Sequence, residues 1–546
     1  MAGGAGGTGG GIATTSLLWA IVMSAFAGKF PSFGGILFGY DTGTIGGCIA
    51  MNDWLQTFGK FDPTPGGLSW YIPTNDKSLV VSILSAGTFF GGLFASPMAD
   101  LVGRKFGLIY SCLIFTLGVG LQLDDHWATF IVGRVIAGLG VGLVSCLVPM
   151  YQSECSPKSM RGAIVGLYQL AITIGALLAA IVLNATKDRP TTQHGEFPFP
   201  YNLFGLSSSQ QEWCALLPES PRYLLLKGRH EEARRSIGRL MTLPPDAPEV
   251  EAEAVEITTA LTVEQQASQG GYAACFKNNE DRNGWRTWTG ILMQGVMATT
   301  YWHQLHFYYG TTFFQQAGIQ NAFIIQIIAD VVNTVMTIVG VNLIDRVGRR
   351  RLLLIGAAGM CISEYIVAIV GVTAGHPHAV ANGVAVNLTA QRVLIAFTCI
   401  YIAFFAISWG PVIWVLTGEI FPLGIRAKSM SLAVASNWLW NFGIGYATPY
   451  LVNPTTTGVN GIKAANLGVK VFFIWGSTCI GCLIFTYFFI PETKGLSLEQ
   501  IDLLYRESSI IGSNSHRQHI IDQDETFTNR FNEKAGHAKD DEKASA

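Results

Sequence analysis

Residues 100–105 read Asp-Leu-Val-Gly-Arg-Lys, and residues 345–350 read Asp-Arg-Val-Gly-Arg-Arg. Each copy directly follows a long apolar segment, so the same chemistry recurs at the ends of two predicted helices. Two more motifs recur in the same order: Glu154–Arg161 is matched by Glu419–Arg426, and Pro218–Arg222 by Pro491–Gly495. Three paired motifs in register predict that the chain consists of two related halves.

The composition is typical of a membrane protein. Of 546 residues, 49% are apolar and only 13% are charged, whereas a soluble domain carries about 25% charged residues. A helix needs roughly 20 mainly apolar residues to cross a bilayer. Two segments, Leu17–Ile49 and Thr287–Phe314, meet this requirement with polar interruptions. Nine meet it cleanly: Leu79–Ala99, Phe106–Leu123, Trp127–Tyr151, Ala163–Leu183, Ala322–Ile344, Leu352–Val372, Val393–Leu416, Met430–Val452 and Val469–Ile490.

Basic residues follow alternate spans, and short cytoplasmic loops carry such an excess. The alternation is consistent within each half. Between the halves, however, the chain leaves the Ala163–Leu183 span on the outer side near Asn184, while the basic stretch after Pro218 must be cytoplasmic. One more crossing is therefore required between Asn184 and Pro218. The segment available there, Phe199–Leu217, is centred on Ser207–Glu212, which a bilayer would not accept. The sixth helix of the first half is therefore not visible in the sequence.

The repeated motifs supply carboxylates, arginines and glycines at the predicted cytoplasmic ends of helices. Such charges can bridge neighbouring helices and hold one side closed until the halves move. The alternative is that they only anchor helix ends and direct membrane insertion. We expect gating roles for Asp100, Gly103, Arg104, Glu154, Arg161, Glu219 and Arg222 in the first half, and for Asp345, Gly348, Arg349, Glu419, Arg426 and Glu492 in the second.

The chain divides into five predicted regions. These are a cytoplasmic N-terminus (1–16), a first membrane bundle (17–217), a cytoplasmic loop (218–286), a second bundle (287–490) and a cytoplasmic tail (491–546). The loop contains amphipathic stretches such as Pro221–Leu240, which predict short helices at the membrane surface. The tail from about Arg506 onward is polar and poor in aromatic residues, which predicts disorder.

The motifs together resemble the sugar porter family of the major facilitator superfamily, and most closely its fungal monosaccharide transporters. The resemblance implies an all-α polytopic membrane protein with two six-helix bundles, a central site and alternating access. It covers roughly residues 30 to 500. The motifs that carry it are Gly39–Gly47, Gly133-Arg134, Pro218–Arg222, Phe307–Phe314, Gly410–Trp414 and Pro491–Gly495.

Four charged residues stand out inside predicted spans, where a charge is costly and by default functional: Asp41, Arg134, Asp330 and Glu364. The resemblance implies that Asp41 and Arg134 form a proton-coupling pair, in which protonation of the acid releases the arginine. The alternative is a static ion pair that joins two helices, as in a uniporter. Asp330 stands where related sequences usually carry a neutral polar residue.

A sugar needs hydrogen-bond partners for its hydroxyls and an aromatic surface for its apolar face. The resemblance assigns sugar contacts to Gln169, Asn333, Trp414 and Asn437, with Phe405 lining the same cavity. Any one of them could instead make an interhelical hydrogen bond of about 0.6 kcal/mol. Related transporters carry a Gln-Gln pair followed by an Asn in the helix before Phe307. In this chain the pair is missing, and Gln304 aligns with the Asn.

Two further departures from the family pattern affect the functional interpretation. Lys29-Phe-Pro31 interrupts the first span, and the sixth helix is not visible. An imperfect gene model giving an inactive product would account for all three departures. A second alternative is a sugar sensor that signals without transport, although such relatives typically carry a much longer cytoplasmic tail.

The leading prediction is a plasma-membrane monomer that imports a monosaccharide, a hexose such as glucose, together with protons, with both termini in the cytoplasm. No nucleophile, metal cluster or nucleotide loop is visible, so we expect neither an enzyme nor a cofactor. The net charge of −2 gives no basic surface for nucleic acid, so the expected partners are the sugar, the proton and the lipid bilayer.

Overall fold

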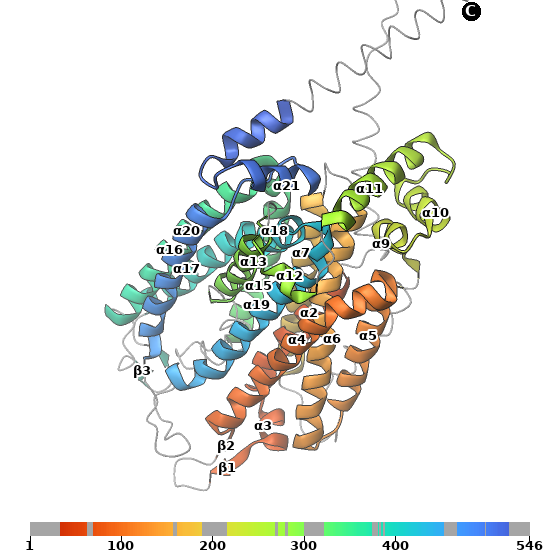
Figure 1. Ribbon diagram of the computed structural model, residues 1–546. Coiled ribbons are helices and arrows are strands. Elements are labelled where there is room, and N and C mark those ends of the chain that lie inside the picture. The colour runs from red at the N-terminus through yellow and green to blue at the C-terminus, as the bar shows by residue number, and fades with distance from the viewer. Residues whose placement is uncertain are drawn as a thin grey trace, which may run out of the picture.

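Long apolar helices dominate the computed structural model of the protein (Figure 1). The structure describes residues 33–62, 69–156, 161–187, 214, 216–267, 271–278, 282–299, 322–373, 380–381, 384–385, 388–452, 467–496 and 498–522. The absent sixth helix (Phe199–Leu217, except its last residues), the Lys29–Pro31 interruption and Gln304 therefore lie outside the described residues.

The described part of the first half contains five long helices: α2 (Phe33–Cys48), α4 (Thr74–Val102), α5 (Arg104–Leu121), α6 (Trp127–Cys155) and α7 (Arg161–Thr186). Between α2 and α4 lie α3 (Asn52–Phe58) and an antiparallel pair, β1 (Lys60–Asp62) with β2 (Ser69–Tyr71). Small residues allow the helices to pack closely. A Cβ atom at Gly39 of α2, for example, would collide with the backbone of Ile172 on α7.

Among the described residues, the first half is followed by α9 (Pro221–Leu226), α10 (His230–Met241), α11 (Pro248–Ala267) and α12 (Tyr272–Cys275). The amphipathic stretch Pro221–Leu240 is helical as predicted, but it forms two helices. The chain turns between them at Gly228, whose φ of +72° suits glycine. Leu224, Ile237 and Val250 bring the first three of these helices together in a small core of their own.

The second half contains α13 (Asn283–Thr299), α15 (Ala322–Val347), α16 (Arg349–Thr373), α17 (Leu388–Ile407), α18 (Trp409–Glu419), α19 (Leu423–Val452) and α20 (Val471–Phe489). A short antiparallel pair, β3 (Val380–Ala381) with β4 (Val384–Ala385), precedes α17, and a 3-10 turn, η3 (Gly468–Lys470), precedes α20. The helix α21 (Leu498–Glu507) follows.

Eight helical segments in the described part of the chain are long and apolar enough to cross a membrane. They correspond to eight of the nine clean segments predicted. The ninth, Met430–Val452, lies within the 30-residue helix α19 but is not among the eight. The predicted span Val393–Leu416 is broken at Ser408, whose φ of −122° and ψ of −85° separate α17 from α18. Pro411, which has no backbone N–H to donate, follows the break.

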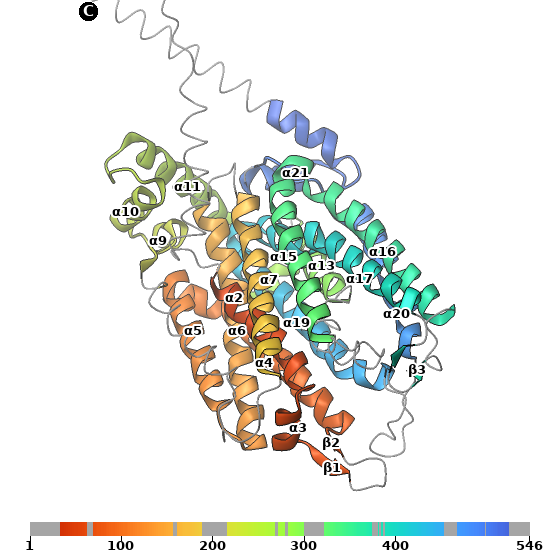
Figure 2. The same ribbon diagram turned by 180° about the vertical axis from the view of Figure 1, so that it is seen from behind.

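The two halves make their most extensive contact along two pairs of helices, α4 with α19 and α7 with α15. Gly92 on α4 lies against Ala435 on α19, and Gly166 on α7 lies against Val341 on α15. Figures 1 and 2 show α9–α11 and α21 at one end of the molecule and the strand pairs at the other. We call the first of these the basic end, because α5 and α16 begin there at Arg104 and Arg349.

The prediction of disorder from Arg506 onward is wrong for residues 506–522. Residues 513–522 are helical, and this segment packs on the basic end of the second half. Arg350 Nη1 donates to the carbonyl oxygen atoms of Ile510 and Ile511, and Ser513 Oγ accepts a hydrogen bond from the backbone N–H of Glu492. A polar tail can be ordered in this way because it supplies hydrogen-bond partners to backbone groups and arginines in the rest of the protein.

Candidate functional site

The first half carries a buried charge cluster at the basic end. Arg104 donates to both carboxylate oxygens of Glu154, at 3.0 Å from Nη2 and 3.1 Å from Nε. Glu219 accepts the backbone N–H groups of Arg104 and Lys105 at 3.0 and 3.1 Å. A carboxylate at the start of a helix satisfies free N–H groups and interacts favourably with the helix dipole. Glu219 therefore caps α5 while Glu154 fixes the first arginine of that helix.

The second half repeats this cluster with the matching residues. Arg349 Nη2 donates to Glu419 at 2.9 Å, and Glu492 accepts the backbone N–H groups of Arg349 and Arg350 at 2.9 and 3.2 Å. Thr493 donates a hydroxyl hydrogen bond to Glu419, as Ser220 does to Glu154 in the first half. The paired sequence motifs thus build the same structure twice.

Two glycines make both clusters possible. Gly103 has φ +93° and Gly348 has φ +104°, a backbone conformation that residues with a side chain rarely adopt. A Cβ atom at either position would also collide with the carboxylate of the capping glutamate, Glu219 or Glu492. Burial raises the pKa of Glu219, and the three backbone N–H groups that it accepts oppose this rise.

One contact at the basic end joins the two halves. The backbone N–H of Ala163, near the start of α7, donates to Asp345 Oδ2 at 3.1 Å. Asp345 Oδ1 lies 2.9 Å from Arg349 Nη1 in the same half. A movement of α7 away from α15 would break the first contact and leave the second intact.

Four other residues were also predicted to have gating roles: Asp100, Arg161, Arg222 and Arg426. Asp100 is exposed at the end of α4, and Arg222 is buried in α9. Arg426 donates to the carbonyl oxygen of Phe421 from both Nε (3.2 Å) and Nη2 (3.1 Å). Arg161 begins α7, but its side chain lies outside the described structure.

Asp41 on α2 and Arg134 on α6 meet in the interior of the first half. Arg134 Nη1 lies 3.0 Å from Asp41 Oδ1, and both side chains are fully buried. Asp41 Oδ2 and the Nε and Nη2 atoms of Arg134 contact no hydrogen-bonding partner among the described residues. The pair is therefore electrically neutral but has unused hydrogen-bonding capacity on both sides.

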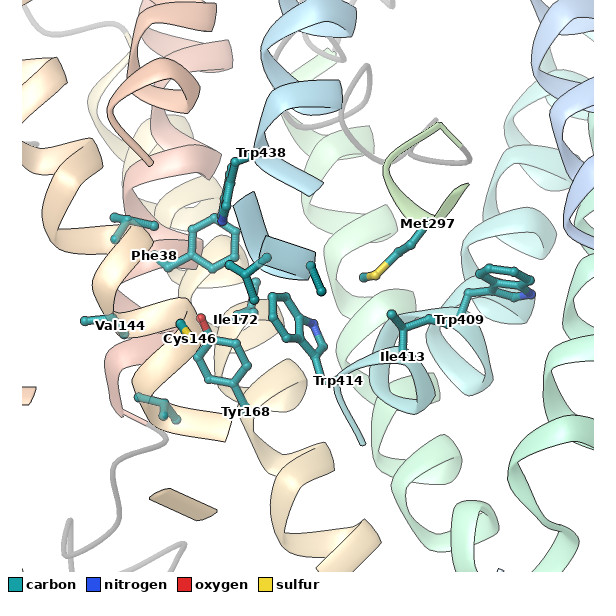
Figure 3. Packing of buried hydrophobic residues seen from close by; sticks show 14 of the residues in the cluster. Phe38, Val144, Cys146, Tyr168, Ile172, Met297, Trp409, Ile413, Trp414 and Trp438 are labelled. Carbon is teal, nitrogen blue, oxygen red and sulfur yellow. The ribbon is translucent and has the colours of Figure 1, made fainter. Parts of the chain in front are cut away.

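The predicted sugar contacts Gln169, Phe405 and Trp414 come together where the halves meet. Trp414 Nε1 donates to Gln169 Oε1 at 3.1 Å, which links α18 of the second half to α7 of the first. The ring of Tyr168 packs edge-on against Trp414 with centroids 5.1 Å apart. A Cβ atom built on Gly410 would touch both Phe405 and Gln169. Figure 3 shows Trp414 and Tyr168 in the centre of the buried cluster.

Asn437 belongs to a polar chain in the second half. Its Nδ2 donates to Gln294 Oε1 at 2.9 Å, and its Oδ1 accepts from Asn441 Nδ2 at 2.6 Å. Gln294 Nε2 in turn donates to Thr417 Oγ1 at 2.8 Å. Gln294 and Asn441 were not predicted as site residues, although each is an amide inside an apolar span, the same signal that marked Asn437.

The wall of α13 beyond Gln294 is apolar. Met297 and Ala298 are fully buried, in the helix where related transporters carry their glutamine pair. Figure 3 shows the Met297 side chain directed toward Ile413. The packing of α13 beyond Gln294 is therefore apolar in the described part of this helix.

Trp438 makes a further contact between the halves that sequence reasoning missed. Its Nε1 donates to Ser145 Oγ on α6 at 3.2 Å, and its ring packs edge-on against Phe38 on α2 at 5.1 Å. Two tryptophans of the second half therefore donate hydrogen bonds to the first half. Trp414 lies on α18, and Trp438 lies on the next helix, α19. Periodicity alone does not reveal which face of an apolar helix meets the other half.

Three more intramembrane residues are buried in the second half. Asn333 and Asp330 lie on α15, and Glu364 lies on α16. Gln326 Nε2 donates to Asp330 Oδ2 at 3.1 Å. Neither carboxylate oxygen of Glu364 accepts a hydrogen bond from a described residue.

Comparison with known proteins places these features in a family. The model of the Sugar (and other) transporter family matches residues 29–505. The chain is 46% identical over 500 residues to the "Major facilitator-type transporter ecdD" of Aspergillus rugulosus, covering 90% of this chain and 89% of that protein. It is 42% identical to the "Probable glucose transporter rco-3" of Neurospora crassa, covering 88% and 78%.

Another relative has a different role in its name. The chain is 38% identical to the "High glucose sensor RGT2" of Saccharomyces cerevisiae, covering 92% of this chain and 64% of that protein. Among solved structures, the proton:xylose symporter XylE bound to 6-bromo-6-deoxy-D-glucose superimposes with a TM-score of 0.72 at 26% identity, covering 87% of this chain and 97% of that one.

Proposed function

The chain belongs to the Sugar (and other) transporter family, and from this premise we propose that it imports a hexose such as glucose together with protons by alternating access. It is a multi-pass membrane protein of the major facilitator superfamily and not an enzyme. The observation that carries the proposal is the neutral pair of Asp41 and Arg134, buried in the half that also supplies Gln169 to the contact between the halves.

Protonation of Asp41 would remove the negative charge that neutralises Arg134. The arginine would then be an uncompensated buried charge, a state that costs several kcal/mol. Its rearrangement can shift α6 relative to α2, and Ser145 on the same α6 contacts Trp438 of the second half. Binding of a proton in the first half is in this way linked to the contacts that join the halves.

Sugar binding acts at the same boundary. Gln169, Trp414 and Asn437 provide hydrogen-bond donors and acceptors, and the rings of Trp414 and Phe405 provide apolar surface. A sugar that competes for the amide of Gln169 would replace its bond to Trp414. The halves could then rock about the site, which would break the contact of Asp345 with Ala163 at the basic end.

The location that fits this proposal is the plasma membrane, with the basic end and both termini in the cytoplasm and the protein acting as a monomer. The basic residues at the starts of α5 and α16 support this orientation, because cytoplasmic loops carry the excess of lysine and arginine.

A second candidate is a sugar sensor, which the similarity to RGT2 favours. Uptake of labelled glucose in a yeast strain that lacks hexose carriers separates the two. We expect uptake that an uncoupler abolishes. Uptake that is insensitive to the uncoupler would contradict proton coupling. Absence of uptake by a protein present at the cell surface would favour the sensor or an inactive protein.

A further inference from the structure

Asp330 is a buried carboxylate on the face of α15 that is turned toward the other half. Phe323 and Val341 lie on the same helical face as Asp330, since all are spaced at close to whole numbers of turns. Lys187 at the end of α7 lies over the ring of Phe323, and Gly166 of α7 lies against Val341. Asp330 is between these two contacts along α15, so it faces the boundary between the halves.

The carboxylate is only partly satisfied. Asp330 is 1% exposed, and Oδ2 accepts one hydrogen bond from Gln326 Nε2. Oδ1 of Asp330 and Oε1 of Gln326 accept none from the described residues. Two buried acceptor atoms, one turn apart on one face, therefore call for donor groups from elsewhere.

The facing helix supplies no compensating charge. From Tyr168 to Thr186, α7 contains no lysine, arginine, aspartate or glutamate. The next basic residue, Lys187, lies over Phe323, which is seven residues and thus roughly 10 Å along α15 from Asp330. A carboxylate inside a membrane protein normally pairs with a cation or marks the path of a substrate.

The site is also close in sequence to a predicted sugar contact. Asn333 follows Asp330 on the same face of α15, and α7 carries Gln169. A substrate that contacts Asn333 would therefore lie against the same face of α15 as Asp330.

We propose that Asp330 and Gln326 form an acidic subsite that binds a protonated amine of the substrate, and that the protein prefers a hexosamine such as glucosamine over the parent hexose. This inference rests on the proposed function, because it assigns a substrate class to the same site. The amine would donate to Asp330 Oδ1 and Gln326 Oε1 and neutralise the carboxylate.

Uptake of labelled glucosamine and glucose, measured side by side in the carrier-deficient strain, tests the subsite. We expect Asp330→Asn to lower kcat/KM for glucosamine about tenfold or more, the size typical of losing a buried charge partner, with glucose within about twofold. Asp330→Glu keeps the charge and should keep the preference. Glu364→Gln is the matched control, because it removes a buried carboxylate from α16, outside the boundary between the halves.

A binding measurement separates failure of the subsite from failure of transport. With the purified full chain, glucosamine should raise the melting temperature more than glucose or N-acetylglucosamine, and Asp330→Asn should remove this difference. An unchanged glucosamine-to-glucose ratio in Asp330→Asn, or an equal loss for both sugars, would overturn the subsite while leaving hexose transport intact. No uptake of either sugar, with the melting shifts as expected, would overturn the proposed transport and keep the subsite.

Discussion

Arg134 Nη1 lies 3.0 Å from Asp41 Oδ1, and neither side chain has any solvent exposure. We expect Asp41→Asn to abolish accumulation of sugar against a gradient while allowing exchange of sugar across the membrane, because the neutral amide cannot carry the proton. The measurement is uptake with and without an uncoupler, together with counterflow in vesicles.

The substitution also leaves Arg134 buried without a counter-charge, which costs roughly 3–5 kcal/mol. Surface expression therefore has to be measured in parallel, and Asp41→Glu serves as the variant that keeps the charge. Accumulation by Asp41→Asn equal to that of the parent protein would show that the pair is static, as in a uniporter.

The duplicated cap clusters make a prediction about stability. Gly103→Ala and Gly348→Ala should each lower the free energy of unfolding by about 1–3 kcal/mol, because their backbone conformation is nearly restricted to glycine and the new methyl group collides with Glu219 or Glu492. Thermal unfolding in detergent measures the effect.

Gly443→Ala is the control for both variants. Gly443 lies within α19, and a Cβ atom there meets nothing within 4 Å. Alanine is favoured over glycine inside a helix by about 1 kcal/mol, so this variant should be neutral or more stable. If Gly103→Ala and Gly348→Ala melt at the same temperature as Gly443→Ala, then the glycine conformation at the two capped helix starts contributes nothing measurable to the stability of the protein.

The hydrogen bond between Trp414 and Gln169 predicts coupling between the halves. Trp414→Phe removes the indole donor and keeps a ring against Tyr168, while Gln169→Leu removes the acceptor. Each should weaken sugar binding, because each removes a predicted sugar contact. The effect of the double variant should differ from the sum of the two single effects, because the two side chains contact each other. A double-mutant cycle on the sugar dissociation constant checks this, and strict additivity would argue against a shared role.

These positions also show how far the sequence could predict the structure. The starts of α5 and α16 follow only in part from local rules, since a glycine precedes the arginine that begins each helix. The capping glutamates, Glu219 and Glu492, lie 115 and 143 residues after Arg104 and Arg349, so local sequence does not specify the caps. The pair of Asp41 with Arg134 was expected from the resemblance, and the structure brings the two side chains together. The role proposed for them stays a prediction.

Other features depend on tertiary contacts that the sequence does not encode locally. Gln294, Trp438 and Ser145 lie in long helices whose partner-facing side the sequence pattern did not identify. The break at Ser408 was missed because both flanking helices are apolar. Disorder of the tail was predicted from its composition alone. Composition does not reveal that the backbone carbonyl groups of the tail accept hydrogen bonds from Arg350.

The attachment of the tail leads to the last prediction. Arg286, at the start of α13, is fully buried; it donates to Asp502 and to the carbonyl oxygen of Ile501, and its guanidinium lies 4.2 Å from the centre of the Tyr505 ring. Arg286→Lys loses the planar group that can make all these contacts at once. We therefore expect α21 to detach in this variant, and limited proteolysis of the purified protein should cut residues 498–522 faster than in the parent.

Arg235→Ala, at an exposed position on α10, is the control and should leave the rate of cleavage unchanged. If α21 is as protected in Arg286→Lys as in the parent, then the remaining bonds of the tail to Arg350 and Glu492 are sufficient to hold it.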